Sequence, residues 1–393
     1  MKIALTCPAS LPATQFGGIL FLCVDIATEL SKLNHEVTIY TTDLDFANNT
    51  NTFNKKLPRI EKVHGFTIKR SHVFFKVKLF FVNPGLYRQI KNDHPEVIHA
   101  VGIRGFQTFV AALISKFKNI PLVVSDQGGL FTHPDFKKNL LNNIMYKLQE
   151  PMIRFIVKQA KKIIVANEYE KDIFLRFCDE SKITIIRNGI NLEMVNFPTS
   201  NFKEKYKIES PFILFLGRFN KVKGIDILLN AVNLIKDRKE FSNFKLIIMG
   251  VDFGFETEML EMINELELKD IVLIIRNPSR DDVISAYRES KFLVLPSRWE
   301  LSPLTPLEGF AFKKTVISTK AHGIPYLIKD GENSLLVEPE NYKVLADAII
   351  DLITDEKKCI DYGLAGYNMV QEICNSRIMA QNALKLYECV INR

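Results

Sequence analysis

Four charged residues in the second half of the chain have the types and spacing needed to bind a phosphate-bearing anion. Arg218 and Lys223 lie on a loop bounded by glycines, directly after an apolar run that predicts a strand. Glu300 and Glu308 follow later, eight positions apart, where a Pro-rich loop leads into a predicted helix near Thr305. A helix start has free N–H groups that attract anions, and two cations beside it would neutralise a diphosphate.

The same stretch also permits a purely structural interpretation. The run Thr305-Pro-Leu-Glu308 matches a capping box with proline at the first helical position. Under that interpretation Glu308 only marks the helix start, and Arg218 and Lys223 are two ordinary exposed cations. Spacing alone leaves both interpretations open.

The elements that must position these residues alternate between strands and helices in both halves of the chain. This alternation predicts an α/β fold of two Rossmann-like, doubly wound domains that face each other across a cleft. We expect domain boundaries at 1–190 and 191–370, with 371–393 a terminal helix that can pack back on the first domain. Ligands of such sheets bind at the carboxyl ends of the strands, which is where the loops named above are predicted to lie.

Composition excludes several classes of protein. The 393 residues are 47% hydrophobic and 25% charged, which is typical of globular domains. The six cysteines are scattered without CxxC spacing, which argues against a zinc site and against a disulfide framework. We see no secretory signal and no apolar run of transmembrane length, so we expect a cytoplasmic protein.

The positive charge is concentrated in the first half. Residues 1–190 hold 26 Lys and Arg against 16 Asp and Glu, whereas 191–393 hold 26 against 29. Such a surface suits an anionic partner, and a solvated basic surface is the alternative. Within it, the segment Val73–Lys91 mixes phenylalanines with cations. It is predicted either to lie at a membrane interface or to form a helix packed on the sheet with its lysines outward.

The order of these motifs resembles one enzyme family. Gly217-Arg218, Lys223-Gly224, Pro296-Ser297 and the Glu300/Glu308 pair are similar to the motifs of retaining family 4 (group 1) glycosyltransferases, which have the GT-B fold. Further similarities are Gly17-Gly18, Asn188-Gly189-Ile190, Asp330-Gly331 and Leu335-Leu336-Val337. The resemblance covers nearly the whole chain and is stronger in its second half.

The resemblance implies a nucleotide-diphosphate-sugar donor, linked to UDP or GDP, held mainly by the second domain. Arg218 and Lys223 would grip the diphosphate, and backbone amides near Leu304 and Thr305 would cap it. Glu308 would bind the ribose hydroxyls, and Glu300 the donor sugar. Arg276 and Asn277 would lie near the base, and Gly18 and Ser302 also belong to the predicted donor site. No cofactor and no bound metal are expected.

The chain also departs from the family pattern. Relatives commonly have a histidine after the strand predicted at 122–125, where this chain has Asp126-Gln127. Asp126 is therefore a candidate catalytic residue beside Arg218, Lys223 and Glu300, although it could simply cap a turn. His133 and His99 are candidates for the acceptor side, with a core-edge role as the alternative for His99. Tyr326 stands where relatives commonly have a glutamate.

The resemblance thus implies a retaining hexosyltransferase with a lipid-linked or saccharide acceptor, acting in glycan or glycolipid biosynthesis. The protein would then work in the cytoplasm or peripherally on the inner face of the membrane, with no nucleic acid as partner. Two alternatives are a degenerate nucleotide-sugar-binding partner subunit, which the departures favour, and a GT-B epimerase.

Overall fold

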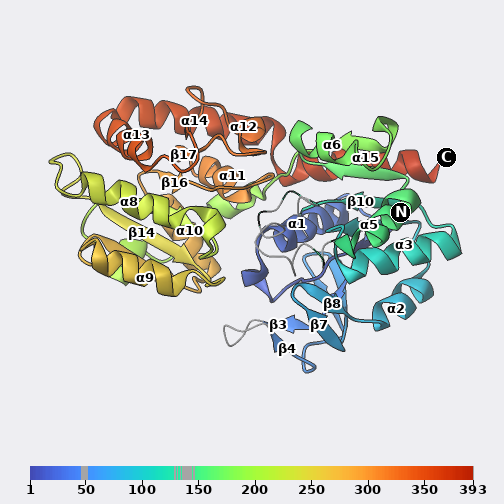
Figure 1. Ribbon diagram of the computed structural model, residues 1–393. Helices are drawn as coiled ribbons and strands as arrows, with labels where there is room; N and C mark the ends of the chain where they lie inside the picture. The colour runs from blue at the N-terminus through green and yellow to red at the C-terminus, as the bar shows by residue number, and fades with distance from the viewer. Residues whose placement is uncertain are drawn as a thin grey trace. The chain divides into compact units, whose positions relative to one another are not determined.

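The structure is a computed structural model that describes residues 1–45, 52–127, 130, 132, 134, 144 and 147–392 (Figure 1). The chain divides into two compact units. One unit combines Met1–Gly189 with Ser376–Arg393, and the other is Ile190–Asn375. The terminal helix α15 (Ser376–Ile391) therefore belongs to the first unit, where it packs against α1 (Gly18–Lys32).

The first unit is built on an eight-stranded sheet of order β12-β11-β10-β9-β1-β2-β6-β5. Every pairing is parallel except that of β5 with β6. Its strands are β1 (Lys2–Thr6), β2 (Glu36–Thr42), β5 (Ile60–Val63), β6 (Phe66–Ser71), β9 (Val97–Val101), β10 (Leu122–Ser125), β11 (Lys162–Val165) and β12 (Ile183–Ile185). The central strands read as continuous apolar runs because helices cover a parallel sheet on both faces.

The helices of the first unit, besides α1 and α15, follow the strands in order. Within the described ranges of this unit they are α2 (Gly85–Asp93), α3 (Phe106–Lys118), α5 (Glu150–Gln159) and α6 (Glu168–Phe174). Two small antiparallel pairs accompany the main sheet, β3 (Leu44–Asp45) with β4 (Thr52–Phe53), and β7 (Phe75–Val77) with β8 (Phe80–Val82).

The β7–β8 pair corrects the helix predicted as one alternative for Val73–Lys91. Residues 75–82 form a hairpin, and α2 begins only at Gly85, after Asn83-Pro84. Alternation along 75–77 places Phe75 and Val77 on one face and Lys76 on the other, which suits a strand. The proline prevents the helix from extending further towards the N-terminus.

The second unit has a six-stranded, fully parallel sheet of order β15-β14-β13-β16-β17-β18. Helices lie on both sides of it (Figure 1). Its strands are β13 (Phe212–Leu216), β14 (Lys245–Gly250), β15 (Val272–Arg276), β16 (Leu293–Leu295), β17 (Val316–Thr319) and β18 (Ser334–Val337). Its helices are α7 (Phe202–Tyr206), α8 (Ile225–Ile235), α9 (Glu256–Glu265), α10 (Arg280–Glu289), α11 (Leu304–Ala311), α12 (Ile324–Leu327), α13 (Tyr342–Thr354) and α14 (Glu356–Ile373).

The strand order reverses beside β13, since β14 lies on one side of it and β16 on the other. The loops that follow β13 and β16 therefore leave the sheet at a topological switch point, the usual ligand site of such sheets. Among the described residues, no helix is long and apolar enough to cross a membrane.

Candidate functional site

Two glycines allow the loops at this switch point to approach one another. Gly224 has φ 72°, and a Cβ there would lie 2.0 Å from the carbonyl oxygen of Pro296. A Cβ on Gly250 would lie 1.8 Å from the carbonyl oxygen of Gly217. Only glycine fits at these two positions, so the loops after β13, β14 and β16 are held in backbone contact.

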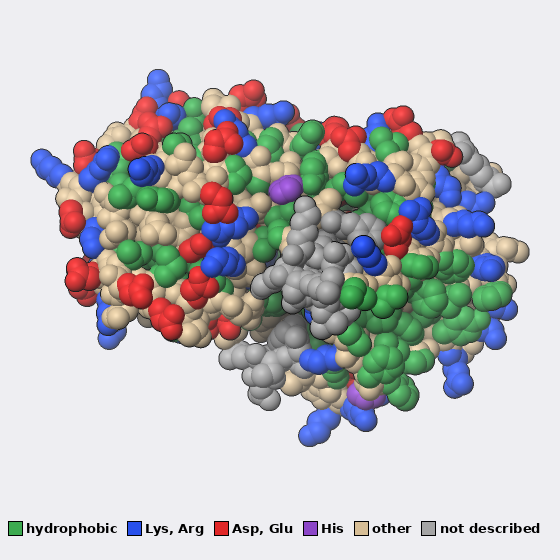
Figure 2. Space-filling model, in the orientation of Figure 1, with side chains coloured by type: hydrophobic (Ala, Val, Ile, Leu, Met, Phe, Trp, Pro, Cys, Tyr) green, Lys and Arg blue, Asp and Glu red, His purple; other side chains and the backbone are tan. Residues whose placement is uncertain are grey.

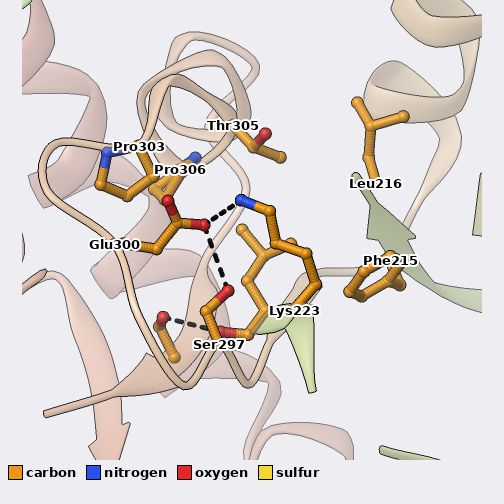
Figure 3. Close-up of a pocket in the computed structure, with 10 residues that line it drawn as sticks. Phe215, Leu216, Lys223, Ser297, Glu300, Pro303, Thr305 and Pro306 are labelled. Carbon is orange, nitrogen blue, oxygen red and sulfur yellow. Dashed lines mark hydrogen bonds and ion pairs between the residues drawn. The ribbon is translucent and has the colours of Figure 1, made fainter. Parts of the chain in front are cut away.

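Lys223 and Glu300 meet where these loops converge (Figure 3). The Lys223 ammonium forms an ion pair with the Glu300 carboxylate, and the Ser297 hydroxyl donates a hydrogen bond of 3.2 Å to the same carboxylate. The Lys223 and Glu300 side chains are 27% and 14% exposed, so a ligand can reach both. They line one pocket together with Phe215, Leu216, Leu295, Ser297, Pro303, Thr305, Pro306 and Ser318.

Arg218 lies on the same loop as Lys223, directly before a buried phenylalanine. Phe219 is 0% exposed and holds the loop to the core, while Arg218 points to the surface. The Arg218 guanidinium stacks on Phe253, 4.9 Å from the ring centroid. A stacked guanidinium keeps its outward N–H groups available, which suits the binding of a phosphate.

Helix α11 begins at Leu304, and this start corrects the predicted capping box. Its N-cap is Pro303, which makes no side-chain cap, so Thr305 is the second helical residue and Pro306 the third. The first amides of the helix have no intrahelical partner, and those of Leu304 and Thr305 lie beside the pocket-lining residues.

Glu308 is held by two side chains from α10 and not by the helix start. Its carboxylate accepts hydrogen bonds from Arg280 Nη1 at 3.0 Å and from the Tyr287 hydroxyl at 2.7 Å. Burial, together with the negative charge of Glu308, raises the pKa of Tyr287, so the phenol remains a donor. These contacts fix the carboxylate in one orientation, with 12% of the side chain exposed.

Arg276 ends strand β15, and Asn277 follows it. Arg276 pairs with Glu256 of α9. Asn277 adopts φ 49° and donates its backbone N–H to the Gly250 carbonyl at 2.8 Å. Within the described part of the chain, the buried Asn277 Oδ1 has no hydrogen-bond partner, so it can accept a bond from a ligand. Ser302 lies half-buried in the loop between Glu300 and α11.

The candidates of the first unit lie in different settings. Gly18 starts α1, after Gly17 with φ 98°. Asp126 is 2% exposed and accepts a hydrogen bond from the Leu130 N–H at 3.2 Å. This contact fits the turn-capping role named above as the alternative to a catalytic one. His133 lies outside the described residues.

His99 lies in the interior of the first unit at 1% exposure. Its Nδ1 contacts the Tyr387 hydroxyl at 2.6 Å, and its Nε2 contacts Ser125 Oγ at 3.0 Å. Burial lowers the pKa of His99 to about 4, so the ring is neutral at pH 7. His99 therefore has the core-edge role named above as its alternative, and its ring joins α15 to the sheet of the first unit.

Several residues of the site were not singled out from sequence. Arg298 makes paired hydrogen bonds to Asp226 at 2.7 and 2.8 Å, and its backbone N–H donates to the Val222 carbonyl at 2.8 Å. It thereby fastens the Glu300 loop to the Lys223 loop. A glycine at the end of an apolar strand could have indicated Gly250, but no pattern indicated Arg280, Tyr287 or Arg298.

Comparison with known proteins places the chain in a family. The family model described as Glycosyl transferases group 1 matches residues 196–369, and that described as Glycosyltransferase Family 4 matches residues 16–194. The chain belongs to the family 4 glycosyltransferases. The residues matched by the first model include Arg218, Lys223, Glu300 and Glu308.

Two relatives show how far the sequence similarity extends along the chain. It is 25% identical over 344 residues, 84% of this chain and 85% of the relative, to N,N'-diacetylbacillosaminyl-diphospho-undecaprenol alpha-1,3-N-acetylgalactosaminyltransferase of Campylobacter jejuni. It is 33% identical over 208 residues to an uncharacterized glycosyltransferase of Methanocaldococcus jannaschii. That match covers 52% of this chain and only about half, 53%, of the relative.

Solved structures agree with the predicted GT-B fold of two Rossmann-like domains. Sucrose-phosphate synthase from Thermosynechococcus elongatus matches with a TM-score of 0.80 at 18% identity, over 99% of both chains. The Anabaena protein HepE, in complex with UDP and glucose, matches with a TM-score of 0.76 at 18% identity, also over 99% of both chains.

Proposed function

We propose that this glycosyltransferase transfers a hexose from a UDP- or GDP-linked sugar to a lipid-linked or oligosaccharide acceptor. Transfer would retain the anomeric configuration and need no bound metal. One observation carries the proposal: Lys223, Glu300 and the start of α11 line the same pocket, with Arg218 on the loop that supplies Lys223.

These residues would act on the charge of the leaving group. As the bond from sugar to phosphate breaks, negative charge grows on the nucleoside diphosphate. Arg218, Lys223 and the first amides of α11 would stabilise that charge, which lowers the barrier without a metal. Lys223 would exchange its bond to Glu300 for a phosphate oxygen, which would free the Glu300 carboxylate for the donor sugar. The acceptor hydroxyl would attack on the face from which the diphosphate leaves, passing its proton to the departing phosphate.

Glu308 and Asn277 would hold the nucleoside. The Glu308 carboxylate, oriented by Arg280 and Tyr287, can accept hydrogen bonds from two adjacent ribose hydroxyls. The Asn277 Oδ1 can accept one from a base N–H. Support for UDP comes from HepE, solved with UDP and glucose. Support for a lipid-linked acceptor comes from the Campylobacter relative, whose name specifies an undecaprenol diphosphate.

The test uses the purified protein with UDP-, GDP- and ADP-sugars. The true donor should raise the melting temperature, because a ligand at 100 times its Kd adds about 2.7 kcal/mol of stability. Transfer to a lipid-linked acceptor should survive EDTA, and NMR of the product should show the donor's anomeric configuration. Inversion, or loss of turnover in EDTA, would refute those parts of the proposal.

A second candidate is a partner subunit that binds the donor without transferring it. The closed setting of Asp126, 2% exposed and bonded to Leu130, favours this function, since relatives commonly place a histidine there. It predicts a thermal shift with a nucleotide sugar but no product with any acceptor of the panel.

A further inference from the structure

The β7–β8 hairpin of the first unit exposes large apolar side chains in close succession. Phe74 is 75% exposed, Phe75 59%, Leu79 49% and Val77 47%. The hairpin is short: Val77 pairs with Phe80, so only Lys78 and Leu79 form the turn. Isolated apolar residues on a surface are ordinary, but four within six positions form a patch that indicates a binding surface.

The hairpin is anchored, so this patch cannot fold inward. Phe81 is 0% exposed and packs against Phe53, with ring centroids 5.2 Å apart. On the other face Phe80 meets Phe106 of α3 edge-on at 5.9 Å, and Gln107 donates a hydrogen bond of 3.0 Å to the Phe81 carbonyl. Strand β8 is thus held to the unit on both of its faces. The exposed side chains of β7 and of the turn therefore stay in water.

The segment that carries the patch has charged side chains of one sign only. Residues 62–92 contain no Asp or Glu, and Lys76 and Lys78 are exposed within the hairpin itself. In Figure 2, hydrophobic side chains gather over α3 and the hairpin, with Lys and Arg at the margin of this area. Apolar side chains edged by cations match the interface of a membrane that carries anionic lipid.

The size of the patch argues against a protein partner. A stable protein interface buries about 800 Å² on each side, which four side chains in and beside one short hairpin cannot supply. A membrane requires no such area, because a few aromatic side chains can enter the boundary between headgroups and acyl chains.

We propose that the β7–β8 hairpin docks this protein on an anionic membrane. Phe74, Phe75, Val77 and Leu79 enter the headgroup boundary, and Lys76 and Lys78 meet lipid phosphates. The inference rests on the proposed function in one respect: a lipid-linked acceptor lies in the membrane, so docking would bring the enzyme to it. Membrane binding itself needs neither donor nor acceptor.

The test is sedimentation of the full chain with vesicles of phosphatidylcholine alone or mixed with phosphatidylglycerol. The wild type should bind the mixed vesicles, and added salt should weaken that binding. Phe75→Ser with Leu79→Ser should lower the partition coefficient about tenfold or more on both vesicle types. Lys76→Ser with Lys78→Ser should lower it about tenfold on anionic vesicles only.

Matched controls come from the second unit. Leu260→Ser with Ile360→Ser removes apolar side chains that are 42% and 52% exposed, and Lys343→Ser with Lys357→Ser removes two exposed cations. Both controls should bind as the wild type does. The apolar variants and both controls should keep the wild-type melting temperature, because their altered side chains are exposed. Lys76→Ser also removes the contact of the ammonium with the Phe53 ring, 5.8 Å from the centroid, so a small fall is expected for the lysine variant.

Three results would overturn the docking proposal. The wild type could fail to sediment with anionic vesicles, or the hairpin variants could bind as well as the controls. Alternatively, ultracentrifugation could show a dimer that Phe75→Ser with Leu79→Ser abolishes, without vesicle binding, and the patch would then be a contact between two copies. Vesicle binding without sugar transfer would refute only the proposed function.

Discussion

The Tyr287 hydroxyl donates a hydrogen bond of 2.7 Å to the Glu308 carboxylate. The two residues lie on successive helices, α10 and α11, and Tyr287 is 0% exposed. The contact makes Glu308 a fixed acceptor whose position is set from outside its own helix. This explains why the carboxylate does not cap α11 although its sequence would permit it.

Replacing Glu308 should therefore affect both binding and stability. We expect Glu308→Ala to weaken binding of the nucleoside diphosphate about 10- to 100-fold, as measured by calorimetry, because it removes the proposed ribose acceptor. It should also cost about 1–3 kcal/mol of stability, since the buried Tyr287 hydroxyl loses the acceptor of its hydrogen bond. Tyr287→Phe keeps the carboxylate and should weaken binding much less. Full affinity in Glu308→Ala would leave Glu308 a structural residue.

The Lys223–Glu300 ion pair predicts opposite effects for its two members. Lys223→Ala should lower the affinity for a nucleoside diphosphate about 10- to 100-fold, because it removes a phosphate contact. Glu300→Gln releases Lys223, so affinity should be unchanged or higher while turnover falls about 100-fold. Lys221→Ala is the matched control, since Lys221 lies on the same loop but pairs with Glu258 at 2.7 Å. Equal loss of affinity in Lys223→Ala and Glu300→Gln would contradict separate roles.

The contact of Gly224 with Pro296 should make Gly224 intolerant of a side chain. Gly224→Ala combines φ 72° with a Cβ placed 2.0 Å from the Pro296 carbonyl oxygen. We expect a loss of about 3 kcal/mol or more in urea unfolding, together with loss of donor binding as the two loops separate. Gly331→Ala is the control, because φ is 75° there but no atom lies within 4 Å of the added Cβ. It should cost only about 1–2 kcal/mol, and equal losses would exclude the steric explanation.

Glu170 should make stability depend on pH. Burial, and then the charge of Asp126, raise the pKa of Glu170 from 4.5 to about 8. The native state therefore holds a proton that the unfolded chain has already lost between pH 4.5 and 8. The stability associated with the protonated carboxyl is complete below pH 4.5 and declines as pH rises towards 8.

The variant Glu170→Gln tests this dependence, because it keeps the shape of the protonated acid. Its free energy of unfolding, from urea titrations at pH 5 to 8, should fall less steeply with pH than that of the wild type. The difference between the two proteins should be largest at pH 8. Parallel curves would show that Glu170 ionises as an ordinary surface carboxylate does.

Much of the molecule follows from local sequence patterns. The strand predicted at 122–125 has those bounds in the structure, as β10, because a buried parallel strand is a short apolar run. The paired loops around Lys223 and Glu300 could also be predicted to meet, since both follow strands of one parallel sheet. The segment 75–82 could not be assigned from its pattern, because its phenylalanines and lysines fit a helix and a hairpin alike.

By itself the sequence determined the α/β class, the family motifs and the residues able to bind a diphosphate, since all of these depend on residue type and near spacing. Only the tertiary structure decided which other side chains position those residues. Arg280 and Tyr287 reach Glu308, and Arg298 joins Asp226, across separations of 21 to 72 residues. Such contacts depend on how helices and loops pack in space, and no periodicity along the chain encodes them.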